Sequence, residues 1–334
     1  MKQRALGPFR VAEIGLGCMN LSHGYGTPPA AEDAEPLLRA ALDAGVTLFD
    51  TAALYGFGAN ETLVGPVLKA ERDRIVLCSK GGVAGVTGDD GVTRRVIDGR
   101  PQAIRANCEA SLKRLGAEVI DLYYLHRWDK AVPIEESVGA MADLKRAGKV
   151  RALGLSEVSA ATLKRAHREH PIVAVQSEYS LWSRNVELGV LAACRELGAT
   201  LVAFSPLARG FLTGAPPDPA AFDSKDFRKP MPRFMPPHWP ANLKLHAGLV
   251  ELARDAGCTT AQLALAWLLA QGDQVLPIPG TTRIAHLHDN LGAAQANLAP
   301  VLIARAGELI NQRTVSGPRY SSATQPEVDT EEFA

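Results

Sequence analysis

Four polar side chains stand where short apolar segments end, and together they could move a proton. Their places are the end of VTLFD, the following DTAALYG, the end of RIVLCSK and the end of VIDLYYLH, which supply Asp50, Tyr55, Lys80 and His126. A free tyrosine has a pKa of about 10 and holds its proton tightly, but a nearby ammonium lowers that pKa. Lys80 beside Tyr55 would favour the phenolate, and Asp50 would keep Lys80 charged.

Such a group suits the reduction of a carbonyl, which needs a hydride and a proton for the forming alkoxide. His126 could orient the carbonyl oxygen or share the proton. Each residue alone also has an ordinary explanation, as a cap, a loop anchor, a solvated lysine or a surface histidine. Their placement on consecutive strand ends favours the functional interpretation.

A second chemistry would use Lys80 as a Schiff-base nucleophile, as in barrel aldolases. Asp50 argues against it because a paired carboxylate would keep the lysine protonated. Tyr55 would also have no role in that reaction.

The elements that must position these residues follow a regular rhythm. Eight short apolar runs begin near residues 11, 46, 74, 119, 150, 172, 200 and 274, and a stretch that can be helical follows each one. Alternation of this kind is typical of the α/β class, with parallel strands joined by helices. The runs are rich in Val, Ile and Leu, so we expect strands buried on both faces. Eight units predict a (β/α)8 TIM barrel, whose active site lies at the carboxyl ends of the strands.

Long loops are expected on the same face of the barrel. The proline-rich segment 208–240 carries five aromatic residues, Phe211, Phe222, Phe227, Phe234 and Trp239, and predicts a cofactor or substrate lid. The glycine-rich segment 81–92 predicts a flexible active-site loop. One barrel domain should span 1–315, and the polar, acidic segment 316–334 predicts a frayed tail.

Composition excludes several classes of function. Lys plus Arg and Asp plus Glu both number 36, so no charge excess favours nucleic acid or membrane as a partner, and a small molecule is expected. The five cysteines are scattered and form no CxxC pair, which predicts neither a disulfide framework nor a zinc site. Without an apolar targeting segment, we expect a cytoplasmic protein. The oligomeric state is left open.

These motifs, taken in order, resemble the aldo-keto reductase superfamily. The similarity runs through GLGCMN, FDTAALYG, KGG, DLYYLHR, KVRALGLSE, AVQSEYSLWSR, FSPLARGFLTG and PIPGTTRIAHLHDN, over roughly residues 1–300. It implies NADPH-dependent reduction of aldehydes or ketones, with Tyr55 as general acid and Asp50, Lys80 and His126 completing the catalytic set. Some relatives of the family are instead non-catalytic cofactor-binding subunits, and that alternative stays open.

The resemblance also implies a set of cofactor contacts. Ser156 and Gln176 would bind the nicotinamide carboxamide, and Phe204 would stack on its ring. Arg283 would meet the 2′-phosphate, near a helix start that favours phosphate. The remaining implied contacts lie on the pyrophosphate path, on the eighth unit and near the adenine, and they are Gly17, Met19, Ser205, Pro206, Leu207, Arg209, Gly210, Gly280, Thr281, Thr282, Asp289 and Asn290.

Departures from the family pattern affect the cofactor. Glu157 stands where many members have asparagine, so the carboxamide contact could fall to Ser156 alone. Phe204 replaces a more usual tyrosine, while Gly280 and His286 replace a lysine and an arginine that clasp the 2′-phosphate. NADPH is expected on the strength of Arg283, and NADH is the fallback.

Aromatic residues near the strand ends are candidates for substrate contact, because carbonyl substrates bind in largely apolar clefts. They are the lid aromatics together with Tyr25, Trp128 and Trp182. GLGCMN resembles the start of a dinucleotide fingerprint, but Asn20 stands at the third glycine and a loop follows, so a Rossmann fold is disfavoured.

Overall fold

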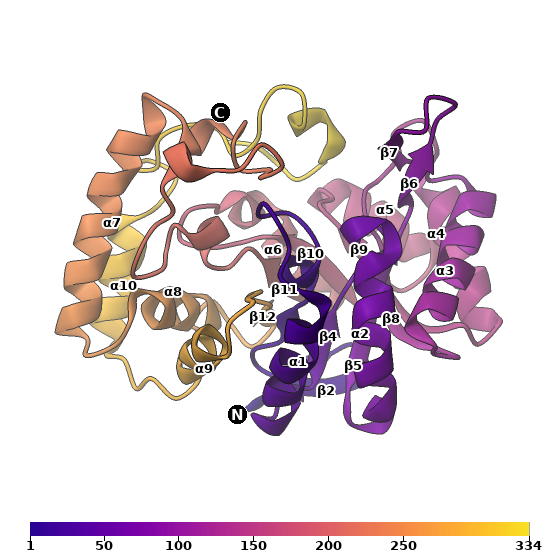
Figure 1. Ribbon diagram of the computed structural model, residues 1–334, viewed down its shortest axis with the longest axis horizontal. Coiled ribbons are helices and arrows are strands. Elements are labelled where there is room, and N and C mark those ends of the chain that lie inside the picture. Colours follow the sequence, from indigo (N-terminus) through magenta and orange to yellow (C-terminus); the bar gives the residue numbers. More distant parts are fainter. Residues whose placement is uncertain (334) are drawn as a thin grey trace.

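Eight parallel strands close into a barrel in the computed structural model, which describes residues 1–333 (Figure 1). Gly15 N donates to Pro277 O at 3.0 Å and Gly17 N to Pro279 O at 3.2 Å, and these bonds join the first strand to the last. The predicted (β/α)8 fold is therefore confirmed. The barrel strands are β3 (Leu16–Gly17), β4 (Leu48–Asp50), β5 (Val76–Gly81), β8 (Ile120–Leu125), β9 (Val150–Ser156), β10 (Ala174–Glu178), β11 (Thr200–Phe204) and β12 (Val275–Pro277).

Helices cover the outside of the sheet, and an apolar layer lies between the two. All residues of β5 and β8 are buried, as expected for strands covered on both faces. Within residues 1–333 no helix has both the length and the apolar character to cross a membrane. The helices are α1 (Ala34–Asp43), α2 (Ala59–Ala70), α3 (Pro101–Leu115), α4 (Ile134–Arg146), α5 (Ala160–Glu169), α6 (Val190–Leu197), α7 (His238–Asp255), α8 (Thr260–Leu269), α9 (Ile284–Gly292) and α10 (Pro300–Leu309).

The apolar run at residues 11–17 supplies the first barrel strand only at its end, where β3 lies. Its start belongs to β2 (Phe9–Ala12), which pairs antiparallel with β1 (Gln3–Leu6) outside the barrel sheet. Leu6 and Val11 are buried in one cluster with the barrel-interior residues Leu122 and Tyr124. The hairpin thus fills the barrel interior with apolar side chains, which explains why its sequence looks like a buried strand.

Two segments predicted as loops have more structure than expected. The glycine-rich segment after β5 forms a hairpin of β6 (Val83–Thr87) and β7 (Thr93–Ile97). Segment 208–240 contains short 3-10 turns and ends in the first turn of α7. Its aromatic rings pack on one another and on Trp182, which follows β10: Phe211 stacks on Trp182 at 4.3 Å and Phe234 on Trp239 at 5.4 Å between centroids. These rings belong to the same apolar core that lies between the barrel and its helices.

The polar C-terminal segment packs on the barrel, whereas a frayed tail was expected. It is the yellow chain at the top of Figure 1. Arg319, Val328 and Thr330 are buried, and Lys130 Nζ donates to Pro326 O at 2.9 Å. Ala334 lies outside the described residues. Hydrogen bonds and ion pairs hold this segment. Because such contacts leave no pattern of apolar residues in the sequence, the segment looked like a frayed tail.

Candidate active site

The four residues with proton chemistry meet at the carboxyl end of the barrel. Asp50 is the last residue of β4, Lys80 lies near the end of β5, and His126 directly follows β8. Lys80 Nζ forms an ion pair with Asp50 and donates to the Tyr55 hydroxyl oxygen at 2.9 Å. The rings of Tyr55 and His126 lie 5.8 Å apart, edge to face. The strand ends therefore bring all four together, as the sequence predicts.

Local backbone geometry turns Tyr55 toward Lys80. After Tyr55 the chain makes a 3-10 turn in which Gly56 and Gly58 have φ values of 58° and 95°, a region that glycine enters without strain. Asn60, just after this turn, ties the loop to its neighbours: it accepts a hydrogen bond from Thr51 Oγ1 at 2.6 Å and donates one to Cys18 O at 2.8 Å. The tyrosine is thus held by a folded turn.

Lys80 is a saturated ammonium buried completely within the protein. Its three hydrogens have three acceptors, Asp50, Thr51 O at 3.0 Å and Tyr55. Burial alone would lower the pKa of Lys80, but Asp50 and Tyr55 together more than offset this, so the pKa is raised. A protonated, fully bonded amine cannot attack a carbonyl, which removes the support for a Schiff-base mechanism.

Burial also decides the protonation of Tyr55 and His126. It raises the pKa of Tyr55 despite the nearby Lys80, so the lowering expected from the ammonium is outweighed. Tyr55 therefore keeps its proton. Burial, with the charges of Arg127 and Lys80, holds the pKa of His126 well below its ordinary value. The imidazole is neutral, and within residues 1–333 its Nδ1 has no hydrogen-bond partner.

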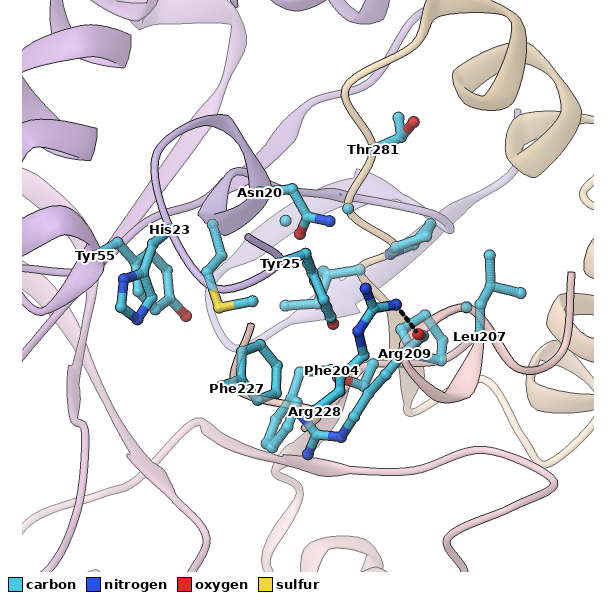
Figure 2. A pocket seen from close by; sticks show the side chains of 18 of the residues that line it. Asn20, His23, Tyr25, Tyr55, Phe204, Leu207, Arg209, Phe227, Arg228 and Thr281 are labelled. Carbon is cyan, nitrogen blue, oxygen red and sulfur yellow. Dashed lines mark hydrogen bonds between the residues drawn. The ribbon is translucent and has the colours of Figure 1, made fainter. Parts of the chain in front are cut away.

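A cavity of about 1090 Å³ extends from this cluster across the barrel mouth (Figure 2). Figure 2 shows Tyr55 and His23 at one end and Thr281 at another, with Tyr25 between them. Every residue implied as a cofactor contact lines this cavity: Gly17, Met19, Ser156, Gln176, Phe204, Ser205, Pro206, Leu207, Arg209, Gly210, Gly280, Thr281, Thr282, Arg283, Asp289 and Asn290.

The residues along the cavity fit a nicotinamide dinucleotide. Near Tyr55, Ser156 Oγ accepts from Arg127 at 3.1 Å, and Gln176 donates to Asp50 at 2.8 Å, so both polar groups are held in place. At the far end the cavity wall includes the residues that lead into α9, and the first N–H groups of a helix favour phosphate. Polar groups and a helix start therefore lie at opposite ends of one cavity.

The structure explains why Gly280 departs from the family pattern. A Cβ at Gly280 would lie 2.6 Å from Asn20 Oδ1 and 2.9 Å from Gly17 O, so the lysine of many members does not fit here. Arg209 lines the cavity as predicted, yet it donates to Glu178 Oε2 at 2.6 Å. Its charge is thus already paired inside the protein.

Only one of the three specifically named substrate residues reaches the cavity. Tyr25 lines it, beside Phe227 at 4.9 Å between ring centroids. Trp128 donates to Val132 O at 2.9 Å and packs against the outer core, while Trp182 is 2% exposed beneath Phe211. Among the lining residues that the structure describes, neither tryptophan appears, so substrate contact does not fit their positions. Both rings are packing residues.

Several residues that line the cavity escaped the sequence analysis. His23, Arg95 and Arg127 surround the Tyr55 end. The C-terminal segment contributes a further set, for which no apolar period or motif gave a signal: Tyr320, Ser321, Thr324, Glu327 and Val328. Glu157, another departure from the family pattern, was expected near the nicotinamide carboxamide. Its carboxylate instead accepts two hydrogen bonds from Arg319, at 3.1 and 2.7 Å.

Comparison with known proteins identifies the family. The pattern of the Aldo/keto reductase family matches residues 13–310. A probable aldo-keto reductase of Glycine max is 42% identical over 313 residues, which are 93% of this chain and 89% of that protein. A glycerol dehydrogenase from Gluconobacter oxydans, 27% identical, has a TM-score of 0.85 and covers 100% of this chain and 99% of its own. For a Klebsiella pneumoniae aldo/keto reductase in complex with NADP and acetate, also 27% identical, the TM-score is 0.72 and the coverage 96% and 99%. The chain belongs to the aldo-keto reductase family of NAD(P)H-dependent oxidoreductases.

Proposed function

We propose that this protein uses NADPH to reduce an aldehyde or ketone to an alcohol, with Tyr55 as the general acid. One observation carries this proposal. The Tyr55 hydroxyl lies on the cavity wall and accepts a hydrogen bond from Lys80, which leaves its own hydrogen free to donate into the cavity. When bound, the reduced nicotinamide supplies a hydride to the carbonyl carbon.

The side chains around that carbon then have distinct tasks. Tyr55 gives its proton to the carbonyl oxygen as negative charge develops there. Lys80 stabilises the phenolate that remains, and Asp50 holds the ammonium in place. The neutral imidazole of His126 donates an N–H to the same oxygen and so fixes its position. The hydride on carbon and the proton on oxygen together complete the alcohol.

Arg283 supports NADPH over NADH. Its side chain is exposed on the cavity wall just before α9, and within residues 1–333 it forms no ion pair. A free guanidinium at a helix start suits the extra phosphate of NADPH. The Klebsiella relatives bound to NADP and NADPH agree with this preference.

An activity assay with a matched pair of variants tests the proposal. Aldehydes, ketones and pyridoxal are offered with NADPH and with NADH, and loss of cofactor absorbance is followed. Tyr55→Phe is expected to lower kcat about 10²–10⁴-fold with little change in NADPH affinity. Tyr123→Phe is the control, because it removes a buried hydroxyl that has no partner in the described part of the chain. Its kcat should match the wild type.

Two outcomes would contradict the proposal. If the wild type binds NADPH tightly but oxidises it with no carbonyl in the panel, the non-catalytic binding subunit is the better description. If Tyr55→Phe retains kcat within about threefold, a different group donates the proton.

A further inference from the structure

Glu157 has an unusual backbone conformation for its residue type. It directly follows Ser156 at the end of β9, is 1% exposed, and has a φ of 55°. This left-handed region is uncommon for residues other than glycine, and asparagine enters it far more readily than glutamate. A glutamate held in this strained conformation indicates that its carboxylate has a task here.

That carboxylate holds the C-terminal segment at two points. Arg319 donates to both oxygens, at 3.1 and 2.7 Å, and the pair is sealed from solvent. Eleven residues further on, Thr330 Oγ1 donates to Glu157 Oε2 at 2.7 Å, and Asp329 N donates to Glu157 O at 2.8 Å. We call Glu157 with Arg319, Asp329 and Thr330 the clasp.

The chain between these two points forms a wall of the cavity. Tyr320, Thr324 and Glu327 all line it, and the Tyr320 hydroxyl accepts from Arg209 at 3.2 Å. Glu327 forms an ion pair with Arg95 of β7, in the hairpin that follows β5. The segment thus reaches from the end of β9 to the hairpin beside the Tyr55 end.

We propose that Glu157 is a positioning residue for substrate binding, because the clasp holds residues 319–330 as a wall of the substrate pocket. This inference rests on the proposed reductase function. Releasing the clasp removes one wall from the bound substrate but leaves Tyr55, Lys80 and Asp50 in place. Substrate affinity is therefore lost while proton transfer continues.

Steady-state kinetics of Glu157→Gln, with the best carbonyl of the panel, test this separation. KM for the carbonyl is expected to rise at least ~10-fold, while kcat stays within about threefold. NADPH affinity close to that of the wild type shows that the barrel is folded. Glu196→Gln is the matched control, since it also removes a carboxylate from an ion pair, but on the exposed surface with Lys164. An unchanged KM for Glu157→Gln, or a loss confined to kcat, overturns the inference.

Limited proteolysis tests the clasp without turnover. A glutamate-specific protease can cut after Glu327 and Glu331, and cleavage should be at least ~10-fold faster in Glu157→Gln than in the wild type. A double variant, Glu157→Gln with Arg319→Met, leaves no unpaired buried charge. Its cleavage rate should lie between those of the wild type and Glu157→Gln. Equal cleavage rates in the wild type and both variants overturn the inference.

A further measurement needs only the wild type, should the variants fail to fold. NADP⁺ with the alcohol product should slow cleavage of the tail, because ligands beneath the wall favour its docked state. An equal cleavage rate with and without these ligands overturns the inference. Failure of the reductase proposal is recognised separately, as the absence of carbonyl reduction by the wild type.

Discussion

Two buried ion pairs lie at the same end of the barrel, and they differ in whether they open onto the cavity. In the clasp, both Glu157 oxygens accept two hydrogen bonds each, from Arg319, Thr330 and the Glu178 N–H. Arg319 Nε has no partner among the described residues, but neither Glu157 nor Arg319 is one of the described residues that line the cavity. In the Lys80 cluster, within residues 1–333, the Tyr55 hydroxyl has no acceptor for its hydrogen and His126 Nδ1 has no partner.

This difference separates an ion pair that holds the C-terminal segment from one that supports proton transfer. The Glu157 carboxylate already accepts four hydrogen bonds and lies away from the cavity, so a new contact there would break an existing bond. An unpaired buried polar group is rare in folded proteins, and Tyr55 and His126 lie on the cavity wall, where a ligand can supply the missing partner. Charge and burial alone would not tell the two sites apart, whereas access to the cavity does.

Lys80→Met should give the largest effect and tests the reacting side of this contrast. The variant removes the cation that stabilises the Tyr55 phenolate and leaves Asp50 with Gln176 as its remaining side-chain donor. We expect kcat to fall about 10³-fold, within the range for a lost acid-base group. Single-turnover kinetics with NADPH would measure it. A kcat within about threefold of the wild type would contradict the assignment.

Arg319→Met tests the holding side. It leaves the Glu157 carboxylate buried without its cation, which typically costs about 3–5 kcal/mol of unfolding free energy. Urea denaturation should show this loss, while kcat at saturating substrate stays near the wild-type value. Lys164→Met at the exposed Glu196 pair is the control, with an expected change of about 0–1 kcal/mol. A large drop in kcat for Arg319→Met would erase the distinction between the two sites.

The acid stability of the clasp has a defined pH window. Burial would raise the pKa of Glu157, but Arg319 and Arg127 lower it from 4.5 to about 2. A carboxylate with a lowered folded pKa stabilises the protein above its unfolded pKa, and this contribution is lost as pH falls toward the folded value. Between pH 4.5 and about 2, the wild type should therefore lose more stability than Glu157→Gln. Parallel curves of unfolding free energy against pH would refute the role of Glu157.

Arg283→Ala should have a smaller effect, confined to the cofactor. It removes the exposed guanidinium before α9 and leaves both buried pairs untouched. We expect the Kd of NADPH to rise about 10-fold, or roughly 1.4 kcal/mol, and that of NADH to stay unchanged. Fluorescence titration of both cofactors would show it. Equal losses for the two cofactors would mean that Arg283 does not read the 2′-phosphate.

The smallest expected effect concerns pH: kcat/KM should not fall on the acid side of neutrality. Because the pKa of His126 is held well below its ordinary value and that of Tyr55 is raised, neither group changes charge near neutral pH. From about pH 8 to about pH 6, kcat/KM should vary by less than about threefold. A steep fall toward the acid end would show that His126 gains a proton there.

The reacting cluster could be predicted from sequence because its members are local signals. Asp50, Lys80 and His126 each end an apolar run, and parallel strands carry such residues to one face. The clasp could not be predicted, because Arg319 lies in a polar segment with no period. Trp128 and Trp182 were misplaced for a related reason, since a ring beside a strand end can turn toward the core or the cavity.

The sequence by itself determined the barrel, the strand ends and the residues that meet there, since apolar periodicity and chain order set the topology. Tertiary structure alone decided which ion pair opens onto the cavity, that burial keeps Tyr55 protonated, and that the C-terminal segment walls the cavity. These properties depend on distance and desolvation between residues far apart in the chain, such as Glu157 and Arg319, and no local pattern encodes them.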